Sequence, residues 1–280
     1  MPDTPTRPAP GDHRRPGPWF PGLPGAATAA RQDGTVPLIC LPYAGGTPSV
    51  FHGWQQRLGT RATVVPVLLP GRGLRLREAP YSALAPLVHD LADALQKHVL
   101  TRHGYALFGH SMGALVAYET ALELRRRGAG EPLHLVVSGS RAPQLYGDRR
   151  DHLLPDEELR AVIGGLGGFG AGGGTADAYF RRRLPALRAD LRACEQYRAR
   201  PRAPLRCPVT AVSATDDPIA TAAQVDAWHT CCAGPFTRLH LPGDHFFLHG
   251  PSSARLLHLM REVCDRLRPH PTQPSGRTPR

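Results

Sequence analysis

The stretch LFGHSMGALVAYE, Leu107 to Glu119, places a serine between two glycines in the order Gly-His-Ser-Met-Gly. A short apolar run precedes this motif and a helix-like pattern follows it. A serine at a sharp turn between a buried strand and a helix is held above the edge of a sheet, where its hydroxyl is accessible. The flanking glycines let the two backbones pass closely in such a turn. Ser111 is therefore a candidate nucleophile, and the alternative is an idle serine in a glycine-rich turn.

On both sides of the motif, short apolar runs alternate with longer helical patterns. This alternation is typical of an α/β fold in which helices flank a mostly parallel sheet. The expected strands are Val36–Leu41, Ala62–Leu69, Tyr105–Phe108, Leu133–Ser138, Val209–Ala214 and Thr237–Leu241. Helices are expected at about 84–100, 112–127, 221–232 and 252–267.

One region, about 143–208, interrupts the alternation because it contains only helical patterns. Its first helix, DEELRAVIGGL, has Asp156 as the expected N-cap, and its second is expected to break at Pro185. The glycine-rich stretch between them is expected to act as a flexible hinge. The region is thus predicted to be a helical insertion between two core strands, and we call it the lid, because such insertions can cover a site at the strand ends.

The two ends of the chain differ in composition from the rest. Residues 1–33 and 269–280 are rich in proline and polar residues, so both are expected to be disordered tails around one domain at 34–268. No apolar run is long enough to cross a membrane, and no secretory signal is visible, so a cytoplasmic protein is expected. Six scattered cysteines indicate reduced thiols, and HTCC at 229–232 lacks the second cluster that a zinc site requires. No metal site is expected.

The chain carries a formal net charge of +11. Such a basic surface favours acidic partners. Nucleic-acid binding is not expected, because no basic motif interleaved with aromatic residues is present. No membrane association is expected either.

An activated serine needs a base and an orienting acid, which in this fold follow it in the order Asp, then His, after later strands. PVTAVSATDDP is a strand that runs into Asp216 and Asp217, and RLHLPGDHFF is a strand that runs into His245. His245 combines a glycine turn, a strand end and flanking aromatics. Asp217 is the preferred acid, Asp216 is the alternative, and Asp244 is expected to brace its own loop.

The reaction also requires an oxyanion hole. One donor is expected to be the backbone N–H of Met112, the residue after the nucleophile. The second is expected in the loop after the first core strand, LPYAGGTPSVF. Ala44 is the preferred donor there, and Gly45 is the alternative.

With these residues assembled, the chain resembles the type II thioesterases of polyketide synthase and nonribosomal peptide synthetase pathways. The segments that carry the resemblance are LICLPYAGGTPSVFHGW, LLPGRGLRLREAPY, LFGHSMGALVAYE, LPALRADLRACEQY, DDPIATAAQVDAW and LPGDHFFLHG. They span about Pro37 to Arg266. The resemblance implies an α/β-hydrolase fold with a helical lid, a triad of Ser111, Asp217 and His245, and an oxyanion loop at Tyr43 to Gly46.

The resemblance also implies a function and a partner. A freestanding, monomeric enzyme is expected to hydrolyse acyl groups from the phosphopantetheine arm of acyl or peptidyl carrier proteins, editing stalled or aberrant intermediates without a cofactor of its own. A product-releasing thioesterase or a small-molecule carboxylesterase with the same triad is the alternative. Eight arginines and two acids lie between Arg181 and Arg202, so Arg181, Arg182 and Arg183 are expected to dock the acidic carrier, unless they only form a solvated helix face.

Overall fold

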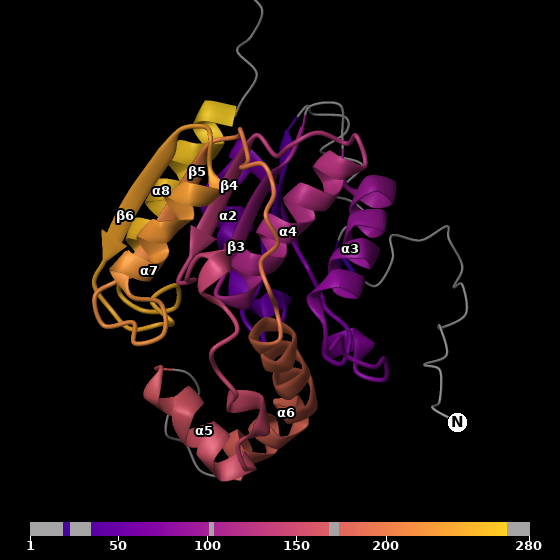
Figure 1. Cartoon of the computed structure of the whole chain (residues 1–280), viewed down its shortest axis with the longest axis vertical. Helices are drawn as coiled ribbons and strands as arrows, with labels where there is room; N and C mark the ends of the chain where they lie inside the picture. Colours follow the sequence, from indigo (N-terminus) through magenta and orange to yellow (C-terminus); the bar gives the residue numbers. More distant parts are fainter. Residues whose placement is uncertain (1–18, 23–34, 101–103, 168–173, 268–280) are drawn as a thin grey trace, which may run out of the picture.

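The chain folds around one sheet of six parallel strands, as the alternating sequence pattern predicts. The computed structural model describes residues 19–22, 35–100, 104–167 and 174–267. The strands lie in the order β2-β1-β3-β4-β5-β6 across the sheet, and Figure 1 labels β3 to β6. Their bounds are β1 Val36–Leu41, β2 Ala62–Pro66, β3 Ala106–His110, β4 His134–Ser138, β5 Val209–Ala214 and β6 Phe236–Leu241. All strand directions agree, so the carboxyl ends meet at one edge, where ligands bind in open α/β sheets.

Helices cover both faces of this sheet. The core on one face includes side chains of α3 (Leu84–His98), α4 (Met112–Arg126) and α7 (Ala222–Asp226). The core on the other face includes side chains of α2 (Trp54–Leu58) and α8 (Ser253–Leu267). With both faces covered, β1, β3, β4 and β5 are buried along their whole length, which is why these strands read as continuous apolar runs. In the described part of the chain, no helix combines the length and apolar character needed to cross a bilayer.

Most predicted bounds hold within a few residues, and three elements differ. β2 ends at Pro66 rather than at Leu69. The Val67 amide still donates to the Cys40 carbonyl oxygen of β1 at 2.9 Å, and the next amide, of Leu68, donates to the Trp19 carbonyl oxygen instead of to a strand. β3 continues to His110, two residues past the predicted end, because a buried histidine there pairs with β4. Helix α7 is shorter than predicted, and a 3₁₀ turn, Ala227–Cys231, completes the segment.

The lid lies beyond the carboxyl edge of the sheet and contains α5 (Asp156–Gly165) and α6 (Gly174–Glu195), seen below the sheet in Figure 1. Asp156 is the first helical residue, and Pro155 takes the N-cap position that was predicted for Asp156. The middle of the predicted glycine hinge, residues 168–173, lies outside the described residues.

The predicted break at Pro185 is wrong, because α6 runs through it. A proline inside a helix removes one hydrogen bond and costs about 3 kcal/mol. The helix continues because residues on both sides of the proline pack into one apolar cluster with α5. That cluster contains Leu159, Ile163, Leu166, Phe180, Leu184 and Leu187.

Residues 196–208 return from the lid to β5 as an extended segment, which we call the strap. The strap is held against α4 by polar contacts. The Tyr197 hydroxyl donates to Glu119 at 2.6 Å, and Arg202 pairs with the same carboxylate at 2.7 Å. Arg125 donates to the carbonyl oxygens of Ala203 and Pro204 at 2.7 and 3.0 Å.

The prediction that the N-terminal tail is disordered throughout residues 1–33 is wrong at residues 19–22. Phe20 is buried in the core on the α3 face, and the carbonyl oxygen of Trp19 accepts a hydrogen bond from the Leu68 amide at 2.7 Å. The guanidinium of Arg75 lies 4.2 Å from the Trp19 ring centroid. Two adjacent aromatic residues supply enough apolar area to hold a short segment on the domain, although prolines flank them. The remaining tail residues lie outside the described ranges.

Candidate active site

Ser111 lies at a strained turn between β3 and α4. Its φ of 55° is positive, and in the described part of the chain no other non-glycine residue has a positive φ. The turn leaves no room for side chains at its flanks. A Cβ on Gly109 would lie 2.1 Å from the carbonyl oxygen of Gly113, and a Cβ on Gly113 would lie 2.2 Å from that of Leu41. Both glycines are required by close backbone packing, so the strained conformation of Ser111 is imposed by its surroundings.

Three predicted site residues meet at this turn. The Nε2 atom of His245 lies 3.0 Å from Oγ of Ser111, and its Nδ1 atom lies 2.8 Å from Oδ2 of Asp217. The Asp217 carboxylate can only accept at neutral pH, so Nδ1 of the neutral imidazole carries the proton. Nε2 is then unprotonated and can accept the serine proton. This arrangement can generate a nucleophilic serine.

The structure distinguishes between the two candidate acids. Asp217 is buried, and its second oxygen, Oδ1, accepts from the amides of Ile219 and Ala220 at 3.0 Å each. Asp216 is exposed and accepts from the hydroxyl of Thr215 instead. Only Asp217 contacts His245.

His110 supports the site in a way that the sequence did not reveal. Its ring is fully buried, and burial together with the neighbouring His245 holds its pKa well below the usual value. Nε2 lies 2.9 Å from the carbonyl oxygen of His245, and Nδ1 lies 2.9 Å from Oγ of Ser138. The neutral ring therefore donates from Nε2 to the carbonyl and accepts from Ser138. It links the end of β3 to the loop that carries His245.

The loop that carries His245 is braced as predicted. Oδ1 of Asp244 accepts from the Phe246 amide at 2.8 Å. The lid contacts this loop closely, since a Cβ on Gly167 would lie 2.1 Å from Oδ2 of Asp244. The buried lid cluster also packs against Ile219 and Phe246. Apolar lid residues thus lie directly over the segments that carry His245 and Asp217.

The predicted oxyanion donors lie in the expected loops. Met112 is the first residue of α4, and Ala44 follows β1. Neither backbone N–H has an acceptor among the described residues. Gly45, the alternative donor, is already engaged, because its amide donates to Oδ2 of Asp190 at 2.7 Å. Ala44 is the better candidate on this geometry.

The predicted docking arginines lie on α6, and two of them border a surface cavity. Arg182 and Arg183 line a cavity of about 380 Å³ together with Thr47, which continues the loop after β1. The same cavity is lined by Leu74 and Leu76, and Leu74 is 88% exposed. Arg181 is exposed beside it. Other arginines of the same run are paired elsewhere, for example Arg188 with Asp156 at 2.5 Å.

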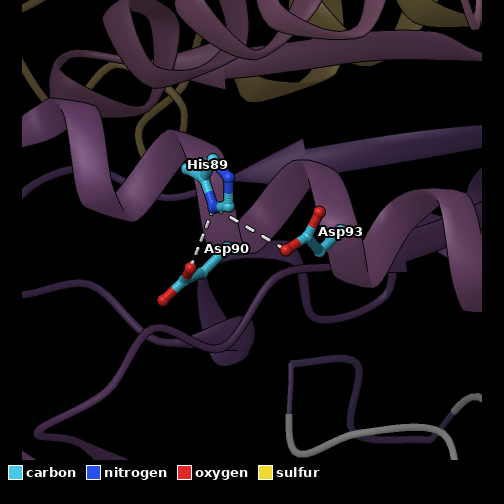
Figure 2. Close-up of side chains that lie close together, drawn as sticks. All are labelled: His89, Asp90 and Asp93. Carbon is cyan, nitrogen blue, oxygen red and sulfur yellow. Dashed lines mark hydrogen bonds and ion pairs between the residues drawn. The ribbon is translucent and has the colours of Figure 1, made fainter. Parts of the chain in front are cut away.

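Among the described residues, one cluster has the composition of a metal site. Figure 2 shows His89, Asp90 and Asp93 on α3, with ligand-type atoms within 4.8 Å of one another. Nδ1 of His89 lies 3.2 Å from an oxygen of Asp90 and 3.7 Å from one of Asp93. All three side chains are exposed.

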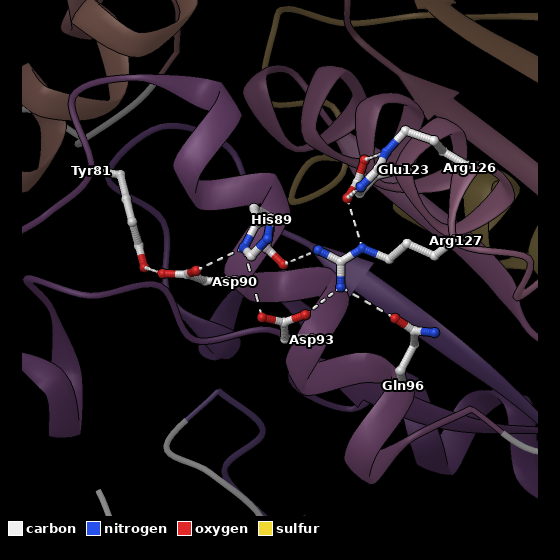
Figure 3. Close-up of polar contacts among 8 residues, drawn as sticks. All are labelled: Tyr81, His89, Asp90, Asp93, Gln96, Glu123, Arg126 and Arg127. Atoms are coloured by element: carbon white, nitrogen blue, oxygen red, sulfur yellow. Dashed lines mark hydrogen bonds and ion pairs between the residues drawn. The ribbon is translucent and has the colours of Figure 1, made fainter. Parts of the chain in front are cut away.

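This cluster is part of a wider polar network between α3 and α4 (Figure 3). Arg127, at the end of α4, pairs with Asp93 and with Glu123 and donates to the backbone oxygen of His89 at 3.0 Å. The Tyr81 hydroxyl donates to Asp90. Because the carboxylates already have protein partners, the cluster joins two helices and is not part of the active site. All six cysteines are free, including Cys231 and Cys232 of the HTCC stretch.

Comparisons with known proteins agree with this geometry. A family model described as a thioesterase domain matches residues 36–265. The structure of RedJ, a thioesterase from the prodiginine biosynthetic pathway in Streptomyces coelicolor, is 61% identical, with a TM-score of 0.79 and coverage of 81% of this chain and 90% of that one. The type II thioesterase BorB from the borrelidin biosynthetic cluster is 37% identical, with a TM-score of 0.71 and coverage of 82% and 91%.

A curated relative, named linear gramicidin dehydrogenase LgrE, from Brevibacillus parabrevis, is 38% identical over 227 residues, which cover 78% of this chain and 83% of the relative. The fold, the matched family and these relatives point to one assignment. The chain belongs to the thioesterase family of α/β-hydrolases, and within it to the type II thioesterases of nonribosomal peptide and polyketide pathways.

Proposed function

We propose that this thioesterase hydrolyses acyl groups from the phosphopantetheine arm of acyl or peptidyl carrier proteins, and so clears stalled or aberrant intermediates. The observation that carries the proposal is the hydrogen-bonded series Ser111, His245, Asp217 beneath an apolar lid. In this role Ser111 is the nucleophile, His245 the general base and Asp217 the residue that orients it.

The first step transfers the acyl group to the enzyme. His245 takes the proton of Ser111 as the serine oxygen attacks the thioester carbonyl carbon. The carbonyl oxygen becomes negatively charged, and the amides of Ala44 and Met112 stabilise it. The C–S bond then breaks, and the pantetheine sulfur leaves as a thiol with the proton that His245 held.

The second step releases the product. His245 removes a proton from water, and the resulting hydroxide attacks the acyl-serine carbonyl. The C–O bond to Ser111 breaks, and His245 returns its proton to the serine. A free carboxylic acid leaves. His245 moves every proton in both steps, and the phosphopantetheine enters as part of the substrate.

The name of LgrE would suggest a different chemistry, hydride transfer. A dinucleotide site requires a G-x-G-x-x-G turn directly after a strand and at the start of a helix. The two matches in this chain, GLGGFG at 165–170 and GFGAGG at 168–173, come after helix α5 in the sequence instead of after a strand. Hydrolysis is therefore the better-supported activity.

Acyl-loaded carrier proteins of several chain lengths provide the direct test. Mass spectrometry should show conversion of acyl-carrier to free phosphopantetheinyl carrier by the native enzyme, and no conversion by Ser111→Ala. A matched acyl oxyester should be hydrolysed far more slowly. Faster hydrolysis of the oxyester would favour a carboxylesterase, and cyclised product would favour a releasing enzyme.

We further propose that Arg181, Arg182 and Arg183 meet the carrier. The support is their position beside a cavity that begins at Thr47, in the loop of the proposed oxyanion donor, and the excess of arginines over acids between Arg181 and Arg202. Charge complementarity between the arginines and an acidic carrier mainly accelerates encounter, and salt weakens it. Added salt should therefore lower kcat/KM for an acyl-carrier and leave that for a small acyl thioester nearly unchanged.

A charge-matched pair of variants tests this surface. Changing Arg181, Arg182 and Arg183 to glutamate should reproduce the loss for the carrier substrate alone. The control changes Arg57, Arg126 and Arg266 to glutamate. These three lie near the ends of α2, α4 and α8, at the edge of the sheet opposite the active site. Equal losses in the two variants would assign the effect to net charge and overturn the docking surface.

A further inference from the structure

A buried ion pair connects the lid to the loop of the proposed oxyanion donor. Arg72, in the turn after β2, binds Asp190 of α6 through two hydrogen bonds of 2.6 and 2.8 Å. Both side chains are almost fully buried, with 3% and 4% exposed. The same Asp190 oxygen accepts from the Gly45 amide at 2.7 Å, and the same Arg72 nitrogen donates to the Gly46 carbonyl oxygen at 3.3 Å.

The pair thus holds the turn Tyr43–Gly46 at two backbone groups. The turn is closed internally by a hydrogen bond of 2.8 Å from the Gly46 amide to the Tyr43 carbonyl oxygen. This carbonyl shares a peptide plane with the Ala44 N–H, and the two groups point in opposite directions. Fixing the turn therefore fixes the direction of the Ala44 N–H.

The lid helix contacts the turn with one face. Leu187 lies one helical turn before Asp190, and a Cβ on Gly45 would lie 3.4 Å from its side chain. Residues three apart share a helix face, so α6 offers the turn an apolar contact and a charged acceptor together. Leu187 and Asp190 thus contact the same residue of the turn, Gly45, from one side of α6.

A role in stability alone does not explain this arrangement. Replacing a buried ion pair by apolar residues of similar volume is often neutral or stabilising. An apolar pair, however, offers no acceptor to the Gly45 amide. What Asp190 adds is a hydrogen-bond acceptor that fixes the direction of the Gly45 amide.

We propose that Asp190 is a positioning residue, which with Arg72 aims the Ala44 N–H at the oxyanion of the acyl-transfer steps. The inference rests on the proposed role of Ala44 as an oxyanion donor. Because Asp190 belongs to α6, the lid contributes to the rate of the chemical step as well as covering the acyl chain. The charge of Asp190 acts through the backbone and does not touch the substrate.

Two variants separate positioning from folding. Asp190→Asn leaves Arg72 charged and buried without its ion-pair partner, so it can also lower stability. The double variant Arg72→Met with Asp190→Leu removes both charges and keeps most of the packing, yet it still lacks an acceptor for Gly45. The control is Glu195→Gln, which alters another buried carboxylate of α6 that binds only the lid residues Asp151 and His152.

The readouts are kcat and KM for an acyl N-acetylcysteamine thioester, and Ki for an acyl trifluoromethyl ketone. The serine oxygen adds to the carbonyl carbon of this ketone and forms a hemiketal oxyanion, which resembles the intermediate of the reaction. Loss of one oxyanion donor costs about 10²- to 10³-fold in kcat, so partial misalignment should cost about 10- to 100-fold. Both variants at position 190 should show this loss with KM nearly unchanged, and Ki should rise in proportion. The control should retain native values.

A folded double variant with native kcat would overturn the inference. So would variants at position 190 in which kcat falls without a rise in Ki, or in which only KM rises. Ser111→Ala, measured alongside, separates this failure from that of the proposed function. Hydrolysis that survives in Ser111→Ala refutes the nucleophile itself, whereas loss there with native rates in the Asp190 variants refutes only the positioning role.

Discussion

Replacing Asp217 by asparagine should inactivate the enzyme through a reversed hydrogen bond, with little change in shape. The amides of Ile219 and Ala220 both donate to Oδ1 at 3.0 Å, so the asparagine oxygen must take that position. Its NH₂ group then faces Nδ1 of His245 and donates to it. The imidazole is forced to carry its proton on Nε2, where it faces the Ser111 hydroxyl and cannot accept a proton.

A wrong histidine tautomer of this kind costs about 10⁴-fold in kcat, which corresponds to about 5.4 kcal/mol of transition-state stabilisation. Asp217→Asn keeps the size of the side chain and both amide hydrogen bonds, so the free energy of unfolding should fall by only about 1 kcal/mol. Thioester turnover followed by thiol release, together with urea unfolding, measures both quantities.

The neighbouring residue supplies the control. Asp216 is exposed, and its carboxylate accepts from the Thr215 hydroxyl, which an asparagine oxygen can also do. Asp216→Asn should therefore change kcat by no more than about twofold, as surface substitutions do. The reasoning is refuted if Asp217→Asn loses less than about tenfold, or if Asp216→Asn loses as much.

Three other expectations concern the nucleophile, the N-terminal anchor and pH. Ser111→Ala should fold normally, lose on the order of 10⁶-fold in kcat, and no longer react with a fluorophosphonate probe; labelling at another residue would contradict the assignment. Phe20→Ala should lower the free energy of unfolding by about 3 kcal/mol in urea, because the ring is 2% exposed, and a change below about 1 kcal/mol would mean that the segment does not dock in solution. Burial holds the pKa of His110 well below its usual value and lowers the pKa of His134 to about 4. The unfolded chain takes up protons at both histidines near pH 6.5 while the folded chain does not, so stability should fall by about 1.4 kcal/mol per histidine between pH 7.5 and 5.5. A flat pH profile of unfolding in this range would show that both histidines take up protons in the folded chain as readily as in the unfolded chain.

The strands, the turn at Ser111 and the triad could be predicted, because each depends on a short stretch of sequence or on the rule that parallel strands end at one edge. Buried parallel strands appear as apolar runs, and the glycines around Ser111 are explained by backbone contacts near 2 Å. The positions after β3, β5 and β6 converge because parallel strands end at one edge. Their order in the sequence was enough to bring Ser111, Asp217 and His245 to a common site.

The parts that could not be predicted depend on contacts between distant segments. Trp19 and Phe20 lie in a proline-rich tail, and only the shape of the core shows that a pocket receives them. His110 occupied a variable position of the motif, and its bond to the His245 carbonyl spans 135 residues of sequence. Asp190 looked like one acid among many arginines, because its partners Arg72 and Gly45 are 118 and 145 residues away.

The strap has a consequence for how this enzyme could diversify. It carries the chain from the end of α6 back to β5 alongside α4, so both ends of the helical part of the lid lie at the carboxyl edge of the sheet. Lineages could exchange or enlarge those helices, and so change the acyl chains that they accept, while every strand and the triad stayed in register. A lid transferred from another enzyme would have to meet one structural requirement. It would have to present a carboxylate where Asp190 meets Arg72 and Gly45. The rest of the lid could then change with the acyl chain that it accepts.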